Sequence, residues 1–256
     1  MTNQNCLIFC NCTADVIPAE KKEQLIGFFH HLNVDVIEIH DLCAYAVHDQ
    51  KALQHIANRY DNKLILACYP RAVKNMLLQA GIGMGAFNVL NFKTSSIEEI
   101  KQQLNNTYGK LYGETVYTVF KNELDVPAWF PVIDQARCTQ CGKCAKFCLF
   151  GVYRFERKKL VVEHPLSCKN LCPACGRTCP SQAIIFPRLK EMSVLAGDEP
   201  SETITTEVRE KEHLLVMLNE RNQNRRLIIK QSVINLAEEE RQKALNEIKM
   251  KQRKNE

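Results

Sequence analysis

Eight cysteines in the middle of the chain occur in two closely spaced runs. The first run has the spacing C-x2-C-x2-C-x3-C, and the second has C-x3-C-x2-C-x3-C. Three thiolates within one tight loop can wrap a corner of an iron–sulfur cube, since the loop turns backbone N–H groups towards the sulfides. The runs therefore predict iron–sulfur chemistry at Cys138, Cys141, Cys144, Cys148, Cys168, Cys172, Cys175 and Cys179.

The two runs also form an internal repeat. A shift of 31 residues superimposes three cysteines of one run on three of the other: Cys141 on Cys172, Cys144 on Cys175 and Cys148 on Cys179. Cys138 instead falls on Lys169, next to Cys168, so the second half holds one extra residue in its first loop. A repeat of this length indicates two copies of one structural unit.

Residues 128–188 resemble the two-cluster [4Fe–4S] ferredoxin family. In that family the fourth cysteine of each run ligates the other cluster. The resemblance therefore implies a crossed assignment, with Cys138, Cys141, Cys144 and Cys179 on the first cluster and Cys168, Cys172, Cys175 and Cys148 on the second. Leu149 stands where the family usually has proline, and the x3 gap of the second run replaces x2, but neither departure removes a ligand.

Zinc sites and disulfides are the alternatives for these cysteines. Structural zinc sites are commonly built from separated C-x2-C pairs, whereas here three cysteines share one loop. Disulfides form in oxidising compartments. The N-terminus has no basic region ahead of its short apolar stretch, so no secretory signal is indicated and we expect a reducing, cytoplasmic location.

Charge and hydropathy exclude other classes of protein. The formal net charge of +5 counts all thiols as neutral, and each [4Fe–4S] cluster held by four thiolates adds about −2. A chain with two clusters would be near neutral, which argues against nucleic-acid binding. No apolar run approaches the roughly 18 residues of a membrane span, so none is expected.

The first part of the chain alternates strand-like and helix-like segments. Strands are predicted at 6–10, 34–39, 63–68 and 87–92, and helices near 18–32, 48–60, 70–80 and 95–106. This alternation predicts a small parallel sheet, an α/β domain over 1–106. Three segments are expected to follow this domain. They are a linker at 107–127 with a strand-like stretch at 115–120, an α+β ferredoxin-like domain at 128–200 and a charged helical tail at 201–256. Trp129, just before the first run, is expected to cover its loop by apolar packing, with an electron-relay role as the alternative.

The N-terminal cysteines fall mostly at strand ends. Cys10 and Cys12 lie at the end of the first predicted strand, Cys43 after the second and Cys68 at the end of the third. In an open parallel sheet these ends share one edge, where ligands bind. Cys6 begins its strand and is expected at the opposite edge, as a small buried hydrophobe.

Residues 5–82 resemble the N-terminal domain of heterodisulfide reductase A subunits. The matching stretches are a C-x-C after the first strand, Leu42-Cys43, and Ala67-Cys68-Tyr69-Pro70-Arg71. The resemblance implies a third iron–sulfur site at Cys10, Cys12, Cys43 and Cys68, and scattered inert cysteines are the alternative. That family's flavin domain has no counterpart: the nearest G-x-G-x-G, at 81–85, follows a helix and precedes a strand, so neither flavin nor NAD is expected.

These features predict an electron-transfer protein that passes single electrons to or from a partner oxidoreductase. One alternative is a thiol/disulfide oxidoreductase acting at the N-terminal cysteines, and another is an iron–sulfur redox sensor or scaffold. No nucleophile–base arrangement is present, so catalysis is expected to belong to the partner. Apolar positions in the tail predict helices at 208–221 and 225–254, which could form a docking or oligomer surface.

Overall fold

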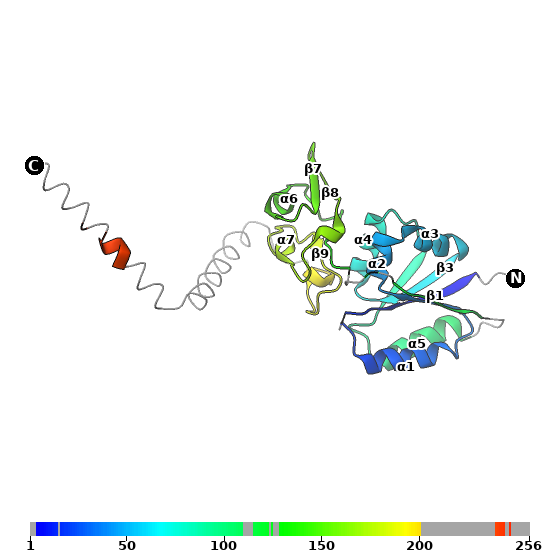
Figure 1. Ribbon diagram of the computed structural model, residues 1–256. Coiled ribbons are helices and arrows are strands. Elements are labelled where there is room, and N and C mark those ends of the chain that lie inside the picture. Colours follow the sequence, from blue (N-terminus) through cyan, green and yellow to red (C-terminus); the bar gives the residue numbers. More distant parts are fainter. Residues whose placement is uncertain are drawn as a thin grey trace, which may run out of the picture. The chain divides into compact units, whose positions relative to one another are not determined.

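The computed structural model describes residues 4–14, 16–109, 115–122, 124, 128–200, 239–243 and 246 (Figure 1). Residues up to Ser201 form one compact unit, and Glu202–Glu256 form another. Most of the predicted tail helices, with the docking surface expected on them, lie outside the described residues. Within the tail, residues 239–243 are helical.

The N-terminal half is built on a parallel five-stranded sheet of order β4-β3-β1-β2-β5. The strands are β1 (Asn5–Asn11), β2 (Asp35–His40), β3 (Asn62–Ala67), β4 (Phe87–Asn91) and β5 (Tyr117–Phe120). β1 is central, and its parallel neighbours β2 and β3 bury almost every residue, as strands covered on both faces do. The predicted α/β fold with a small parallel sheet is confirmed.

Helices cover both faces of this sheet. They are α1 (Ala19–Phe29), α2 (Leu42–His48), α3 (Gln50–Arg59), α4 (Pro70–Gln79) and α5 (Ile97–Tyr108). α1 and α5 lie together below the sheet in Figure 1, and α2, α3 and α4 lie above it. α5 begins at Ser96, whose side chain accepts from the Glu99 amide while Glu99 accepts from the Ser96 amide, a capping box.

Two elements differ from the sequence expectation. The segment predicted as a linker contributes β5, which pairs in parallel with β2 and so belongs to the N-terminal sheet. Its strand-like stretch was visible in the sequence, but pairing with a distant strand was not. The segment after β2 folds as the short helix α2, so Cys43 lies in a helical first turn rather than a loop.

The second half consists of short elements around the cysteine runs. Its elements are β6 (Val132–Ile133), α6 (Lys143–Phe147), β7 (Tyr153–Glu156), β8 (Lys159–Val162), η1 (Pro165–Ser167), α7 (Ala174–Arg177), β9 (Ile184–Ile185) and η2 (Val194–Ala196). β6 pairs antiparallel with β9, and β7 with β8 forms a hairpin between the two cysteine runs. This is the ferredoxin-like region.

The backbone repeats along with the cysteines. Gln140 and Leu171, 31 residues apart, both have left-handed φ angles, 53° and 58°, just before the second cysteine of each run. Gly151 and Gln182, again 31 residues apart, have φ of 65° and 51° just after each run. Non-glycine residues rarely adopt this conformation, so the two loops are turned in the same way.

The segment 128–133 runs between two apolar cores. Ala128, Phe130 and Val132 pack in the core of the sheet domain, whereas Trp129 and Ile133 pack in the core that contains the cysteine runs. This alternation is what an extended segment produces, because successive side chains point to opposite sides. The segment therefore joins the two halves along its length. Within the described residues, no helix is long and apolar enough to cross a membrane.

Candidate iron–sulfur sites

The first cysteine set, Cys138, Cys141, Cys144 and Cys179, surrounds a hollow beside α6. All four residues line it. The pKa of Cys144 is raised to about 12, first by burial and then by the neighbouring thiols of Cys175, Cys179 and Cys138. Burial and then Cys179 and Cys141 also raise the pKa of Cys138. Thiols of the first run therefore lie next to the last cysteine of the second run.

The second cysteine set, Cys148, Cys168, Cys172 and Cys175, groups in the complementary way. The pKa of Cys168 is raised to about 12 by burial and then by the other three thiols of this set. The pKa of Cys175 is raised to about 11, mainly by burial, with Cys148 and Cys172 adding to the shift. The last cysteine of the first run thus lies among the thiols of the second run.

Hydrogen-bond donors point at the sulfur atoms of both sets. The Ala183 amide donates to Cys179 Sγ at 3.4 Å, and the Tyr153 hydroxyl donates to Cys175 Sγ at 3.1 Å. The amides of Gln140 and Ala145 also lower the pKa values of Cys138 and Cys144 by hydrogen bonding. Thiolate donors, a hollow between them and N–H groups aimed at sulfur are what a [4Fe–4S] cluster requires. The residues present fit that group.

Four further cysteines, the N-terminal cysteine set, gather at the carboxyl ends of the three central strands. They are Cys10 in β1, Cys12 just after β1, Cys43 in the first turn of α2 and Cys68 just after β3. The pKa of Cys10 is raised by its hydrogen bond with Cys12, then by burial and by the charges of Cys12, Cys43 and Cys68. All four thiols thus act on one another at the point where the strand order reverses, the usual ligand-binding edge of such a sheet.

Cationic side chains surround the N-terminal cysteine set. Arg188 forms an ion pair with Asp41 at 2.8 Å, and its Nη2 donates to Thr13 Oγ1 at 3.2 Å. Its pKa is raised by Asp41 and by two thiols of the set, against the effect of burial. Lys93 is held by the Leu189 carbonyl at 2.9 Å, and Lys22 donates to the Cys12 carbonyl at 2.9 Å. Positive charge is therefore concentrated where an anionic group would lie.

Cys6 lies at the other end of β1. It is fully buried, and burial raises the pKa of its thiol to about 12, with Lys63 and Asp35 as its charged neighbours. The thiols of the N-terminal cysteine set do not appear among the groups that act on it. Across the described ranges, no three Cys, His, Asp or Glu side chains are drawn together as they would be around one metal ion.

The sequence did not point to Arg188, Lys93 or Tyr153. Arg188 and Lys93 lie far along the chain from the cysteines that they approach. Tyr153 corresponds to Ile184 under the 31-residue shift, so the repeat gave no signal for its hydroxyl. Packing of the two halves brings Arg188 to the N-terminal cysteine set, whereas Tyr153 and Lys93 reach their cysteines through the fold of their own half.

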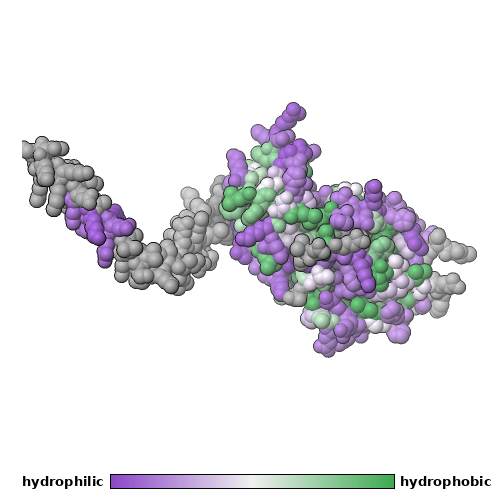
Figure 2. Space-filling view, in the orientation of Figure 1, coloured by the Kyte–Doolittle hydropathy of each residue, from purple (hydrophilic) through white to green (hydrophobic). Residues whose placement is uncertain are grey.

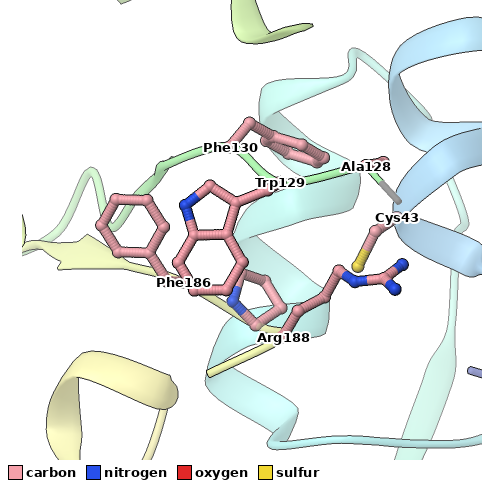
Figure 3. Close-up of a pocket in the computed structure, with 7 residues that line it drawn as sticks. Cys43, Ala128, Trp129, Phe130, Phe186 and Arg188 are labelled. Carbon is pink, nitrogen blue, oxygen red and sulfur yellow. The ribbon is translucent and has the colours of Figure 1, made fainter. Parts of the chain in front are cut away.

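Trp129 lies between two of the cysteine sets. Its indole stacks on Phe186 with ring centroids 5.2 Å apart, and its Nε1 donates to the Cys172 carbonyl at 3.3 Å. The same indole lines a small hollow together with Cys43 and Arg188 (Figure 3). Trp129 precedes the first run in sequence but contacts the second.

The surface beside the second cysteine set is apolar. Green and white side chains gather over α6 and α7 in Figure 2, next to the polar hairpin β7–β8. The exposed apolar residues that flank these cysteines in sequence are Phe147, Leu149, Phe150, Leu166 and Leu171. Apolar contact surface therefore borders this set.

The geometry defines an iron–sulfur protein, and comparisons with known proteins agree. Residues 130–153 match the model of the 4Fe-4S binding domain family. An uncharacterized ferredoxin from Methanocaldococcus jannaschii is 32% identical over 116 residues, 45% of this chain and 79% of the relative. Ferredoxin-3 from Nostoc sp. is 33% identical over 72 residues, 21% of this chain and 73% of that protein. The chain belongs to the ferredoxin family and is an iron–sulfur electron-transfer protein.

Proposed function

We propose that the chain carries two [4Fe–4S] clusters, bound in the crossed arrangement, and exchanges single electrons with a partner oxidoreductase. The observation that carries this proposal is the hollow that Cys138, Cys141 and Cys144 of the first run line together with Cys179 of the second run. The action of the Cys148 thiol on Cys168 and Cys175 of the second run supports it. The clusters supply reversible one-electron transfer, and the protein binds them, donates hydrogen bonds to sulfur and limits access of water.

A third iron–sulfur cluster is proposed at the N-terminal cysteine set. The action of Cys12, Cys43 and Cys68 on Cys10 and three nearby cations, Lys22, Lys93 and Arg188, support this site, because a cluster with four thiolates carries net negative charge that the cations compensate. The resemblance of residues 5–82 to heterodisulfide reductase A subunits points the same way.

Burial argues against disulfide chemistry at the N-terminal cysteine set. Each of its four cysteines is at most 9% exposed. Thiol–disulfide exchange requires a thiolate that a second sulfur can reach, and reactive cysteines are therefore partly exposed. For this reason we favour the function of an electron carrier over that of a thiol/disulfide oxidoreductase.

Iron and acid-labile sulfide, counted in anaerobically purified full-length protein, test both parts of the proposal. Three clusters predict about twelve irons per chain, and two predict about eight. Cys179→Ser is expected to perturb the cluster of the first cysteine set and leave the spectrum of the second unchanged. Cys43→Ser is expected to remove about four irons, whereas Cys6→Ala keeps the full content.

Three results would contradict the proposal in distinguishable ways. Stoichiometric zinc without sulfide would end the iron–sulfur assignment altogether. Equal iron contents of about eight in Cys43→Ser, Cys6→Ala and the unaltered protein would remove the third site and leave the other two. Perturbation of the second set by Cys179→Ser would overturn the crossed arrangement.

A further inference from the structure

Trp129 contacts the second cysteine set and also lines the hollow at Cys43, and the ring of Phe186, on which it stacks, lines the same hollow. On one side its indole N–H donates to the carbonyl of Cys172. On the other side it faces the hollow that Cys43 lines (Figure 3). The side chain is 4% exposed, so water is excluded from most of its surface.

The fold makes this contact unavoidable. Because 128–133 is extended and its neighbours Ala128 and Phe130 face the sheet core, Trp129 must face the core that holds the cysteine runs. Phe186, next to β9, then fixes the plane of the indole by stacking at 20°. The segment before the two cysteine runs thus carries the indole, and the segment after them, through Phe186, holds it in place.

The chain that follows Phe186 closes the other side of the hollow. Arg188 reaches from the ferredoxin-like region to Asp41, beside Cys43, and both side chains of this pair are almost fully buried. The Leu189 carbonyl accepts from Lys93. The N-terminal cysteine set is therefore sealed by residues of the ferredoxin-like region, and Trp129 lies at that junction.

We propose that Trp129 couples the second cysteine set to the N-terminal cysteine set, so that electrons pass between the two sites across its indole. The inference rests on the third cluster of the proposed function. In each transfer one site loses the electron that the other gains, and no bond or proton changes. The rate of electron tunnelling between two redox sites falls with the length of empty space that the electron must cross. A packed indole fills part of that space with bonded atoms, so it increases the rate.

The proposal predicts the effect of replacing the indole. In full-length, fully loaded protein, flash photoreduction with a one-electron donor should be followed by redistribution of electrons between the sites, at a rate independent of protein concentration. Trp129→Leu is expected to slow this redistribution several-fold, with iron content and midpoint potentials unchanged. Trp129→Phe keeps a ring but loses the N–H, and it is expected to slow the rate by a smaller factor.

Phe29→Leu provides the matched control. Phe29 is equally buried and packs edge-on against Phe9 at 5.1 Å in the sheet core, so its replacement disturbs packing without touching either site, and the rate should match that of the unaltered protein. If Trp129→Leu loses iron, the rate of electron redistribution in Trp129→Phe is used as the test instead.

An unaltered rate in a loaded Trp129 variant, or equal slowing by Phe29→Leu, would overturn the assignment of Trp129. A chain that binds only about eight irons would overturn it through the missing third cluster instead. The iron count separates those two failures, because the first occurs in protein that holds about twelve.

Discussion

Tyr153 shows how a single side chain adjusts one site. Its hydroxyl donates to Cys175 Sγ at 3.1 Å, and it is the one side-chain O–H that bonds to a sulfur of the second cysteine set within the described residues. A hydrogen bond to a ligand sulfur stabilises the more negative, reduced state of a cluster, and so raises its reduction potential. The first cysteine set has instead the amide of Ala183 and the hydroxyl of Ser181 near its Cys179. The two sites are therefore adjusted by different groups.

Tyr153→Phe should lower the midpoint potential of the second site only. A net hydrogen-bond contribution of about 1 kcal/mol corresponds, for one electron, to about 40 mV, and this is an upper value because the bond persists in both oxidation states. An EPR-monitored redox titration checks the shift. A change of equal size at the first site would show that Tyr153 acts on the fold rather than on Cys175.

At the scale of elements, the loop of the first run depends on a glycine. Gly142 caps α6 at its N-terminus with φ of 70°, and a Cβ built there would lie 2.5 Å from the ring of Phe155 in β7. The hairpin therefore packs directly on the loop that carries Cys141 and Cys144. The 31-residue shift places Pro173 at the matching position, so this close approach is made in one half alone.

Gly142→Ala is expected to destabilise the protein by about 1–3 kcal/mol, because the left-handed backbone and the contact with Phe155 are both unfavourable for a side chain. Thermal unfolding under anaerobic conditions measures this. Gly27→Ala, in the interior of α1 with no atom within 4 Å of its Cβ, should be neutral or stabilising by about 0.5–1 kcal/mol. If the two variants had equal stability, the packing of the hairpin on the loop would not matter.

The elements also show which parts of the fold could be predicted from the sequence. Buried strands, the α5 cap and the repeat of the cysteine runs follow from local patterns, so they could be predicted. The pairing of β5 with β2 and the helix at Cys43 could not, because the first depends on a partner 81 residues away and the second is only seven residues long. The positions of Trp129 and Arg188 depend on how the two halves pack, and that of Tyr153 on how the hairpin packs on α7, which no spacing encodes.

At the scale of the molecule, Arg71 joins the sheet domain to the ferredoxin-like region. From the start of α4 its Nε donates to Asp134 Oδ2 at 2.7 Å, and both side chains are less than a tenth exposed. Its other nitrogens donate to the carbonyls of Gln182, Val194 and Asp198. Asp134 in turn accepts from the Cys138 amide through its carbonyl. Arg71 therefore links the Cys68 strand end to the loop of the first cysteine set.

Arg71→Ala is expected to destabilise the 1–201 unit by about 3–5 kcal/mol, because it leaves the carboxylate of Asp134 buried without its partner. Arg71→Lys should recover only part of this, since an ammonium cannot reproduce the planar fork that reaches separate acceptors. Lys74→Ala, at an exposed position of the same helix, should change the stability by less than about 0.5 kcal/mol. Denaturant unfolding, followed both by cluster absorbance and by far-UV circular dichroism, measures all three. Because Arg71 holds the halves together, its loss should make the two signals change at different denaturant concentrations, and a single shared transition in Arg71→Ala would refute this role.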